Sequence, residues 1–453
     1  MGRLRRTIRL EGPRAATAIY AKAIARRLLR GKIGNKLAST VPTQVKKEAL
    51  AALEQRIVKL DAAVTDVLQK AAQGDFVILC NGFPGAGQNY GGEFIRSRYG
   101  GYLEQGLKGS VIHLSNRIKT NTVDPFEGTE TAIIRISDGH LNTLAGILAA
   151  GQANVLVHSP PPNVQKVLQK KIALERLIYW FHGFEVRDYR RLYFNYTTSE
   201  LAVLKQRLNE ITQWRIEANK ISFAEPAIKK VFVSNYLKEI AARDNGAQIE
   251  NGHIIPNFID GDVFAYHEKT ANQMKRFLLI RAFERRNYGN DIAIEAIKIA
   301  SKWDGFEDLH FTIRGFGAEF AELTEGLQGF SNVVIQEQYS SPEEMAELHK
   351  EHGVFLCPSR FDTQGVTMGE AMASGLVCIT NPVTGIPEYI DESCGLLAPA
   401  DDPMAYARAI WHAKENLHAM LDLSKAAAQR ARAQCGRDQT VGAEIKLVQS
   451  SSS

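Results

Sequence analysis

The densest run of residues that could do chemistry lies in the last third of the chain, where an apolar segment leads into a glycine-containing loop. GVFLCPS (353–359) is typical of a buried strand, and RFDTQGV (360–366) ends where a helix should begin, near Val366. A helix start presents unpaired N–H groups and a positive dipole end, which suit a diphosphate. Glu370 lies in the first turns of that helix, where its carboxylate could accept hydrogen bonds from ribose hydroxyls.

Arginines form a second set of candidates. Arg281 ends the apolar segment FLLIR (277–281), and Arg285 and Arg286 lie in the loop that follows. Ligands of open parallel sheets bind outside the carboxyl ends of the strands, so Arg281 is expected to face the ligand as a phosphate-binding group. The same residues could also be surface charges.

The N-terminal half offers a glycine-rich loop and a histidine. NGFPGAGQNYGGEF (81–94) precedes a helical stretch and contains Gly91 and Gly92, whereas LIYWFHG (177–183) is an apolar strand that ends in His182. Glycine-rich loops are often simple turns, and a lone histidine is more often a structural group. Both therefore remain candidates at this point.

Metal and disulfide chemistry find little support in the sequence. The five cysteines are scattered, without CxxC spacing, and the histidines form no HxH or HExxH pattern, so we expect no metal site and no disulfide framework. The DGD sequence at 260–262 imitates a metal-binding DxD motif, but we interpret it as a turn within a hinge.

Strands and helices alternate along most of the chain, which predicts two doubly covered parallel sheets joined at a hinge, HIIPNFIDGDVF (253–264). Two such α/β halves imply a cleft between them. The predicted strands begin with residues 76–80, 110–114, 132–136, 154–158, 177–183 and 230–234, and continue with 277–281, 310–317, 332–336, 353–359 and 377–381.

These motifs together resemble the retaining GT-B glycosyltransferases of family four, the glycosyl transferases group 1. In that family, two acids separated by seven intervening residues contact the donor sugar and the nucleotide ribose; here they are Asp362, where Glu is usual, and Glu370, followed by AMASG. The family's diphosphate-binding Arg and Lys correspond to Arg281 and Arg286, with Arg285 as an alternative. His182 corresponds to the family's donor-sugar histidine.

The resemblance implies a nucleotide-diphosphate sugar as substrate, no cofactor and no metal. The implied catalytic residues are His182, Arg281, Arg286 and Asp362. The implied donor-binding residues are Gly91, Gly92, Arg281, Arg285, Arg286, Gly315, Asp362, Gln364, Gly365, Val366, Thr367 and Glu370. The resemblance also implies that the leaving phosphate accepts the proton of the acceptor hydroxyl, so no protein nucleophile is needed.

The resemblance divides the chain into an extension (1–74), a Rossmann-like acceptor domain (75–262), a Rossmann-like donor domain (263–432) and a tail (433–453) that could return to the acceptor domain as a helix. Variants with this pattern resemble enzymes of bacterial O-antigen, capsule and S-layer glycan synthesis. A glycan or lipid-linked acceptor and a cytoplasmic location are therefore expected.

The extension contains a basic and a heptad-patterned stretch. Residues 1–36 hold eleven Lys or Arg and one acid, although the whole chain carries a net charge of only +5. The amphipathic pattern of 14–30 favours an anionic membrane surface, at the inner face of the cytoplasmic membrane, over nucleic acid. A solvated helix packed on the body and a transit peptide are the alternatives. Apolar residues with heptad spacing in 43–71 could pair two chains or pack on the body.

Two rival functions remain open. One is another GT-B reaction, such as sugar-nucleotide epimerisation. The other is a catalytically inactive subunit that binds a membrane or partner through residues 1–74, which the replacement of the usual Glu by Asp362 would allow.

Overall fold

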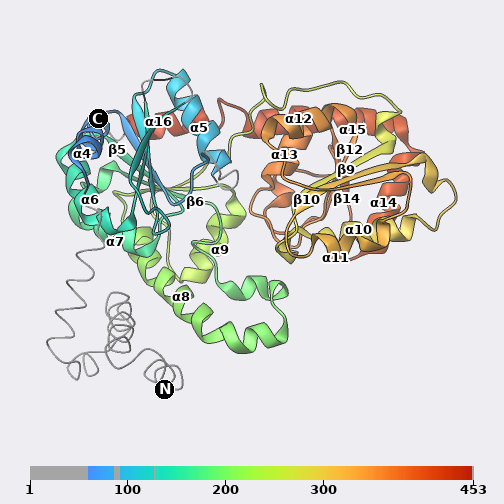
Figure 1. The fold of residues 1–453 in the computed structure, drawn as a ribbon, viewed down its shortest axis with the longest axis horizontal. Coiled ribbons are helices and arrows are strands. Elements are labelled where there is room, and N and C mark those ends of the chain that lie inside the picture. The colour runs from blue at the N-terminus through green and yellow to red at the C-terminus, as the bar shows by residue number, and fades with distance from the viewer. Residues whose placement is uncertain (1–59, 86–91, 127–128, 130, 451–453) are drawn as a thin grey trace, which may run out of the picture.

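A computed structural model describes residues 60–85, 92–126, 129 and 131–450, which form two α/β lobes side by side (Figure 1). The predicted basic helix at 14–30 and most of the heptad stretch lie outside the described residues. No helix in the described part of the chain combines the length and apolarity needed to cross a bilayer.

The N-terminal lobe is built on an eight-stranded sheet in the order β3-β4-β2-β1-β5-β6-β7-β8. All neighbouring strands are parallel except the edge pair β3–β4. The central strands are apolar and buried on both faces because helices cover the sheet on both sides. The strands are β1 (Phe76–Cys80), β2 (Gly109–Leu114), β3 (Thr122–Pro125), β4 (Ala132–Ile136), β5 (Asn154–His158), β6 (Leu177–Phe181), β7 (Lys229–Phe232) and β8 (Gly252–Ile254).

The covering helices of this lobe are α4 (Ala62–Ala71), α5 (Glu93–Glu104), α6 (Leu141–Ala150), α7 (Pro162–Lys171), α8 (Thr198–Ala224) and α9 (Asn235–Asn245). Helix α4 is the described end of the heptad stretch. Its Val64 and Leu68 are buried in the same core cluster as the strands, so this part of the apolar seam packs on the body.

The C-terminal lobe has a six-stranded, all-parallel sheet in the order β11-β10-β9-β12-β13-β14. Its strands are β9 (Arg276–Ala282), β10 (His310–Phe316), β11 (Val333–Glu337), β12 (Val354–Cys357), β13 (Val377–Thr380) and β14 (Leu396–Leu397). Its helices are α10 (Asn290–Ala300), α11 (Phe320–Thr324), α12 (Pro342–Glu351), α13 (Val366–Ala373), α14 (Pro403–Glu415) and α15 (Leu417–Cys435). The predicted fold class, two Rossmann-like domains, is confirmed.

The chain returns to the N-terminal lobe at its end. Helix α16 (Val441–Gln449) lies beside α5 in Figure 1, and its Val441 and Val448 are buried with the aromatic side chains of the N-terminal sheet. The carboxylate of Glu444 is fully buried and accepts hydrogen bonds from Arg98. The last helix is therefore an integral part of the first lobe's core.

Side chains of the C-terminal lobe also bind the backbone of the N-terminal lobe near α9. The carboxylate of Glu388 accepts hydrogen bonds from the backbone N–H groups of Asn235 (2.9 Å) and Tyr236 (2.6 Å), at the start of α9. A carboxylate at a helix N-terminus is favourably placed for the helix dipole. The hydroxyl of Tyr389 donates to the carbonyl of Val233, which ties the same loop to the end of β7.

Candidate functional site

Arg281 lies at the end of β9 with its guanidinium buried and incompletely satisfied. Only 8% of the residue is exposed, and its Nε and Nη2 have no hydrogen-bond partner. The guanidinium lies over the ring of Tyr288, 5.1 Å from the centroid. A buried charge without a hydrogen-bonded counter-ion is costly, so this geometry suits an anionic ligand that completes the missing contacts.

Gly315 allows the backbone to approach Arg281 closely. The two residues are register partners on β10 and β9, and a Cβ at Gly315 would lie 2.1 Å from the carbonyl oxygen of Arg281. Any larger residue would push the strand end apart. The predicted donor residue Gly315 thus positions Arg281 through the backbone.

The loop before α13 is shaped by Asp362. One carboxylate oxygen of Asp362 accepts hydrogen bonds from the backbone N–H groups of Gln364 (3.2 Å) and Gly365 (2.9 Å). Gly365 has φ +81°, a conformation that favours glycine, and α13 begins at the next residue, Val366. The helix starts where it was predicted, and the side-chain oxygen of Thr367 in its first turn is buried without a partner.

Glu370 lies one turn into α13 near Arg281. Burial raises the pKa of its carboxyl group to about 7; the positive charge of Arg281 opposes this shift, and the carboxylate of Glu93 in the other lobe adds to it. A carboxyl group that titrates near neutrality beside a buried arginine is typical of a binding site.

Gln364 has a structural connection that the sequence did not indicate. Its side-chain oxygen accepts hydrogen bonds from the backbone (2.7 Å) and side-chain (2.8 Å) N–H groups of Asn257, and its amide nitrogen donates to the carbonyl of Asn257 (3.1 Å). Asn257 belongs to the predicted hinge. The side chain of Gln364 therefore ties the loop before α13 to the hinge rather than extending into the cleft.

His182 belongs to a packed group of rings in the N-terminal lobe. Its Nε2 lies 3.0 Å from Nδ1 of His158, and its ring lies 4.4 Å, centroid to centroid, from that of Phe94 on α5. Burial, with a further contribution from the positive charge of Arg98, holds the pKa values of both histidines well below their usual range. His182 is thus neutral at pH 7, and its Nδ1 has no hydrogen-bond partner.

The lobes meet beside His182. The backbone carbonyl of His182 accepts a hydrogen bond of 2.8 Å from the hydroxyl of Thr363, in the loop before α13. This contact brings the N-terminal candidate His182 next to the loop before α13 in the C-terminal lobe.

The other predicted site residues are exposed, cap a helix or lie outside the described residues. Arg286 has a side chain that is 51% exposed, 3.8 Å from a carboxylate oxygen of Glu319, and Arg285 is also exposed. Gly92 has φ +97° and caps α5, where a Cβ would lie 2.6 Å from the carbonyl oxygen of Gly82. Gly91 lies outside the described residues.

Arg187 is a cleft residue that the sequence reasoning missed. Its guanidinium lies 4.7 Å above the ring of Phe361, between the lobes, and it interacts electrostatically with Asp362 and Arg285. Its position four residues after the HG dipeptide was a usable signal, because residues that follow a strand end lie at the same sheet edge.

Part of the chain is similar in sequence to known proteins. Residues 275–416 match the family described as Glycosyl transferases group 1. Amylovoran biosynthesis glycosyltransferase AmsK from Erwinia amylovora is 33% identical over 137 residues, which is 28% of this chain and 32% of that protein. The match thus spans about a third of that relative's length.

Solved structures share the two-lobe fold. A sucrose-phosphate synthase from Thermosynechococcus elongatus has a TM-score of 0.63 at 15% identity, covering 83% of this chain and 98% of its own. WaaG, a glycosyltransferase involved in lipopolysaccharide biosynthesis, has a TM-score of 0.59 at 16% identity, covering 82% and 99%. The predicted resemblance to the group 1 glycosyl transferases is confirmed for residues 275–416, within a chain that has the GT-B fold, whereas the retaining mechanism stays a prediction.

Proposed function

We propose that the protein is a glycosyltransferase that moves a sugar from a nucleoside-diphosphate donor to a glycan or lipid-linked acceptor, with retention of configuration. The observation that carries the proposal is the buried, partly unsatisfied guanidinium of Arg281 beside Glu370. Both residues lie within the segment that matches the glycosyl transferase family. An anionic donor group would complete the hydrogen bonding of Arg281, and a ribose would place hydroxyl donors at Glu370.

The reaction needs stabilisation of the departing diphosphate. The bond between the anomeric carbon and the phosphate oxygen breaks, an acceptor hydroxyl oxygen bonds to the same carbon, and its proton passes to the leaving phosphate. Arg281 and the N–H groups at the start of α13 would stabilise the negative charge that develops on the phosphates. This is the role that a metal ion fills in other transferases, so we propose activity without one.

His182 would contact the donor sugar from the opposite lobe. Its neutral ring has an unpartnered Nδ1, and His158 fixes its orientation through the other ring nitrogen. Asp362, whose carboxylate already orders the loop before α13, would lie at the sugar as well. Closure of the lobes around the hinge would exclude water, which limits hydrolysis of the donor.

The biological setting is proposed from the relatives. AmsK is named for amylovoran biosynthesis and WaaG for lipopolysaccharide biosynthesis, which favours a cell-surface polysaccharide as the product here. The basic residues 1–36, which lie outside the described residues, would attract the protein to an anionic membrane carrying a lipid-linked acceptor.

Arg281→Gln tests the donor site against Arg276→Gln, a control at the other end of the same strand. Thermal shift with a panel of nucleoside diphosphates should identify the cognate nucleotide, because a ligand that binds only the native state raises its stability. Calorimetry should then show a loss of roughly 10–150-fold in affinity for Arg281→Gln, the value of a charge-assisted hydrogen bond, and little change for the control.

Transfer from the cognate nucleotide sugar should persist in excess EDTA and should fall in Arg281→Gln. Equal nucleotide affinity in wild type and Arg281→Gln would show that the donor site has been misplaced. Strict dependence on added Mn²⁺ or Mg²⁺ would contradict the metal-free mechanism but would leave the proposed donor site intact.

A further inference from the structure

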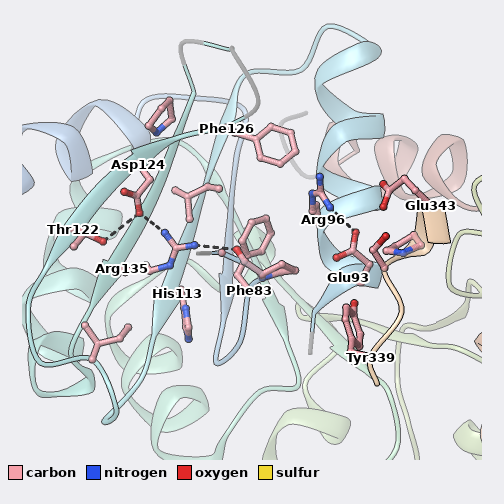
Figure 2. A pocket seen from close by; sticks show the side chains of 17 residues that line it. Phe83, Glu93, Arg96, His113, Thr122, Asp124, Phe126, Arg135, Tyr339 and Glu343 are labelled. Carbon is pink, nitrogen blue, oxygen red and sulfur yellow. Dashed lines mark hydrogen bonds and ion pairs between the residues drawn. The ribbon is translucent and has the colours of Figure 1, made fainter. Parts of the chain in front are cut away.

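A pocket of about 740 Å³ lies on the N-terminal side of the cleft, outside the set of donor residues described above. Figure 2 shows its two walls. One is formed by the β2, β3 and β4 strands together with Phe83, and the other by α5, with Tyr339 and Glu343 reaching in from the C-terminal lobe. The pocket is therefore complete only when the two lobes face each other as they do here.

A fixed arginine and a buried histidine form the first wall. Arg135 forms an ion pair with Asp124 and donates a 3.0 Å hydrogen bond to the carbonyl of Pro84. His113, at the end of β2, is only 5% exposed, and its Nδ1 has no hydrogen-bond partner. His113 is one of the residues that line the pocket, and a polar group of a ligand or a water molecule would complete its hydrogen bonding.

The charge balance of the pocket decides the class of ligand. Two guanidinium groups line it, Arg96 and Arg135, and each is in an ion pair with a carboxylate of the pocket, Glu93 or Asp124. Glu343 adds a third carboxylate. An anionic ligand would meet more acids than bases, whereas hydroxyl groups can donate to carboxylates and accept from guanidinium groups at the same time.

The pocket is also lined by aromatic rings. Phe83, Phe126 and Tyr339 line the pocket together with the charged groups. Paired carboxylates and arginines beside apolar ring surfaces suit a sugar ring, which presents hydroxyls at its edge and C–H groups on its faces.

The pocket adjoins the donor site through Glu93. The carboxylate of Glu93 lines the pocket and also raises the pKa of Glu370, and Tyr339 lies within electrostatic range of both Glu93 and Glu370. A ligand in this pocket would therefore lie beside the donor nucleotide rather than at a remote surface.

We propose that this pocket binds an uncharged sugar ring of the acceptor, with its hydroxyls at Asp124, Arg135 and His113. The proposal rests on the glycosyltransferase function. It specifies that the acceptor residue held here is a neutral sugar, neither a uronic acid nor a phosphorylated ring, and that the start of α12 in the donor lobe contributes to its recognition through Glu343.

The test uses p-nitrophenyl glycosides of neutral hexoses and the matching uronides as acceptors, with the cognate nucleotide sugar. Asp124→Asn and Glu343→Gln remove one carboxylate from each wall, and Asp138→Asn replaces an exposed acid just after β4 as the control. Neutral glycosides should be used and uronides rejected. Both pocket variants should raise the acceptor KM about 10-fold, while donor KM and donor hydrolysis without acceptor stay unchanged.

Three outcomes would overturn the proposal. Uronides could be used as well as neutral glycosides; the pocket variants could behave like the control; or they could weaken nucleotide binding at constant acceptor KM, which would assign the pocket to the nucleobase. Calorimetry with neutral glycosides separates this proposal from the transferase reaction. Binding that is lost in Asp124→Asn supports the pocket even if no donor is turned over, and no binding at all overturns it.

Discussion

Two residues in the cleft carry charges that the resting protein does not fully satisfy. Arg281 has two buried nitrogens without partners, and the pKa of Glu370 is raised to about 7 because burial disfavours its carboxylate. Unsatisfied groups lower the stability of the free protein, so their presence in one cleft is more readily explained by ligand binding than by folding.

Glu370→Gln tests, through the pH dependence of stability, whether the carboxylate of Glu370 destabilises the free protein but favours ligand binding. The folded-state pKa lies above the unfolded value of 4.5, so the native state binds the extra proton and loses stability as pH rises from about 4.5 to about 7. Glu370→Gln should therefore raise the melting temperature at pH 8 but hardly at pH 4, and should weaken nucleotide binding at pH 8.

Melting curves at both pH values, beside calorimetry with the cognate nucleotide, check this prediction. Glu415→Gln, which replaces an exposed carboxylate at the end of α14, is the control and should show neither effect. A Glu370→Gln protein less stable than wild type at pH 8 would mean that the carboxylate stabilises the resting fold.

Sequence reasoning found those residues that carry a local pattern. Gly365 and Glu370 stand at a strand–loop–helix junction whose spacing is visible in the chain, and the structure places that junction as predicted. The tie between Gln364 and Asn257 and the pairing of His158 with His182 were not predictable, because each joins residues from separate elements. Such contacts depend on tertiary packing rather than on local spacing.

At the scale of elements, the turn into α13 depends on one glycine. Gly365 has φ +81°, and an added Cβ would also lie 2.9 Å from the side chain of Ile386. Gly365→Ala should reduce the free energy of unfolding by about 1–2 kcal/mol, the cost of a left-handed conformation for an L-residue, and should weaken nucleotide binding.

Urea unfolding of Gly365→Ala and Gly146→Ala measures this cost. Gly146 lies inside α6 with open space around it and no positive φ, so its replacement should increase stability by roughly 0.5–1 kcal/mol. Equal effects of the two substitutions on the free energy of unfolding would contradict the claim that the turn requires glycine at position 365.

Elements with a weak hydrophobic pattern escaped prediction. The apolar strands of both sheets are visible in the sequence, but β3 is not, because its exposed TVDP segment pairs antiparallel with β4 at the sheet edge. Strands β8 and β14 were not predicted either, and they are only three and two residues long. Long buried strands are visible as apolar runs, whereas short edge strands are specified by their neighbours.

At the scale of the whole molecule, the end of the chain stabilises its beginning. Glu444 on α16 accepts hydrogen bonds from Arg98 (2.8 Å), Tyr102 (2.5 Å) and Trp180 (3.1 Å), and neither member of the Arg98–Glu444 ion pair is exposed. The Trp180 ring stacks against His158, 5.1 Å between centroids, which in turn contacts His182. The C-terminal helix thus supports the wall that carries the proposed sugar-binding histidine.

A double-mutant cycle on this ion pair is the corresponding prediction. Glu444→Leu leaves the Arg98 charge buried without its counter-ion, which should cost about 3–5 kcal/mol in the free energy of unfolding. Arg98→Met/Glu444→Leu should be less destabilised than the two single changes added together, because no charge is then left unpaired. Some loss should remain, since Tyr102 and Trp180 still lack their acceptor. Urea unfolding of the four proteins gives the coupling energy. A coupling near zero would mean that α16 is held by its apolar contacts alone.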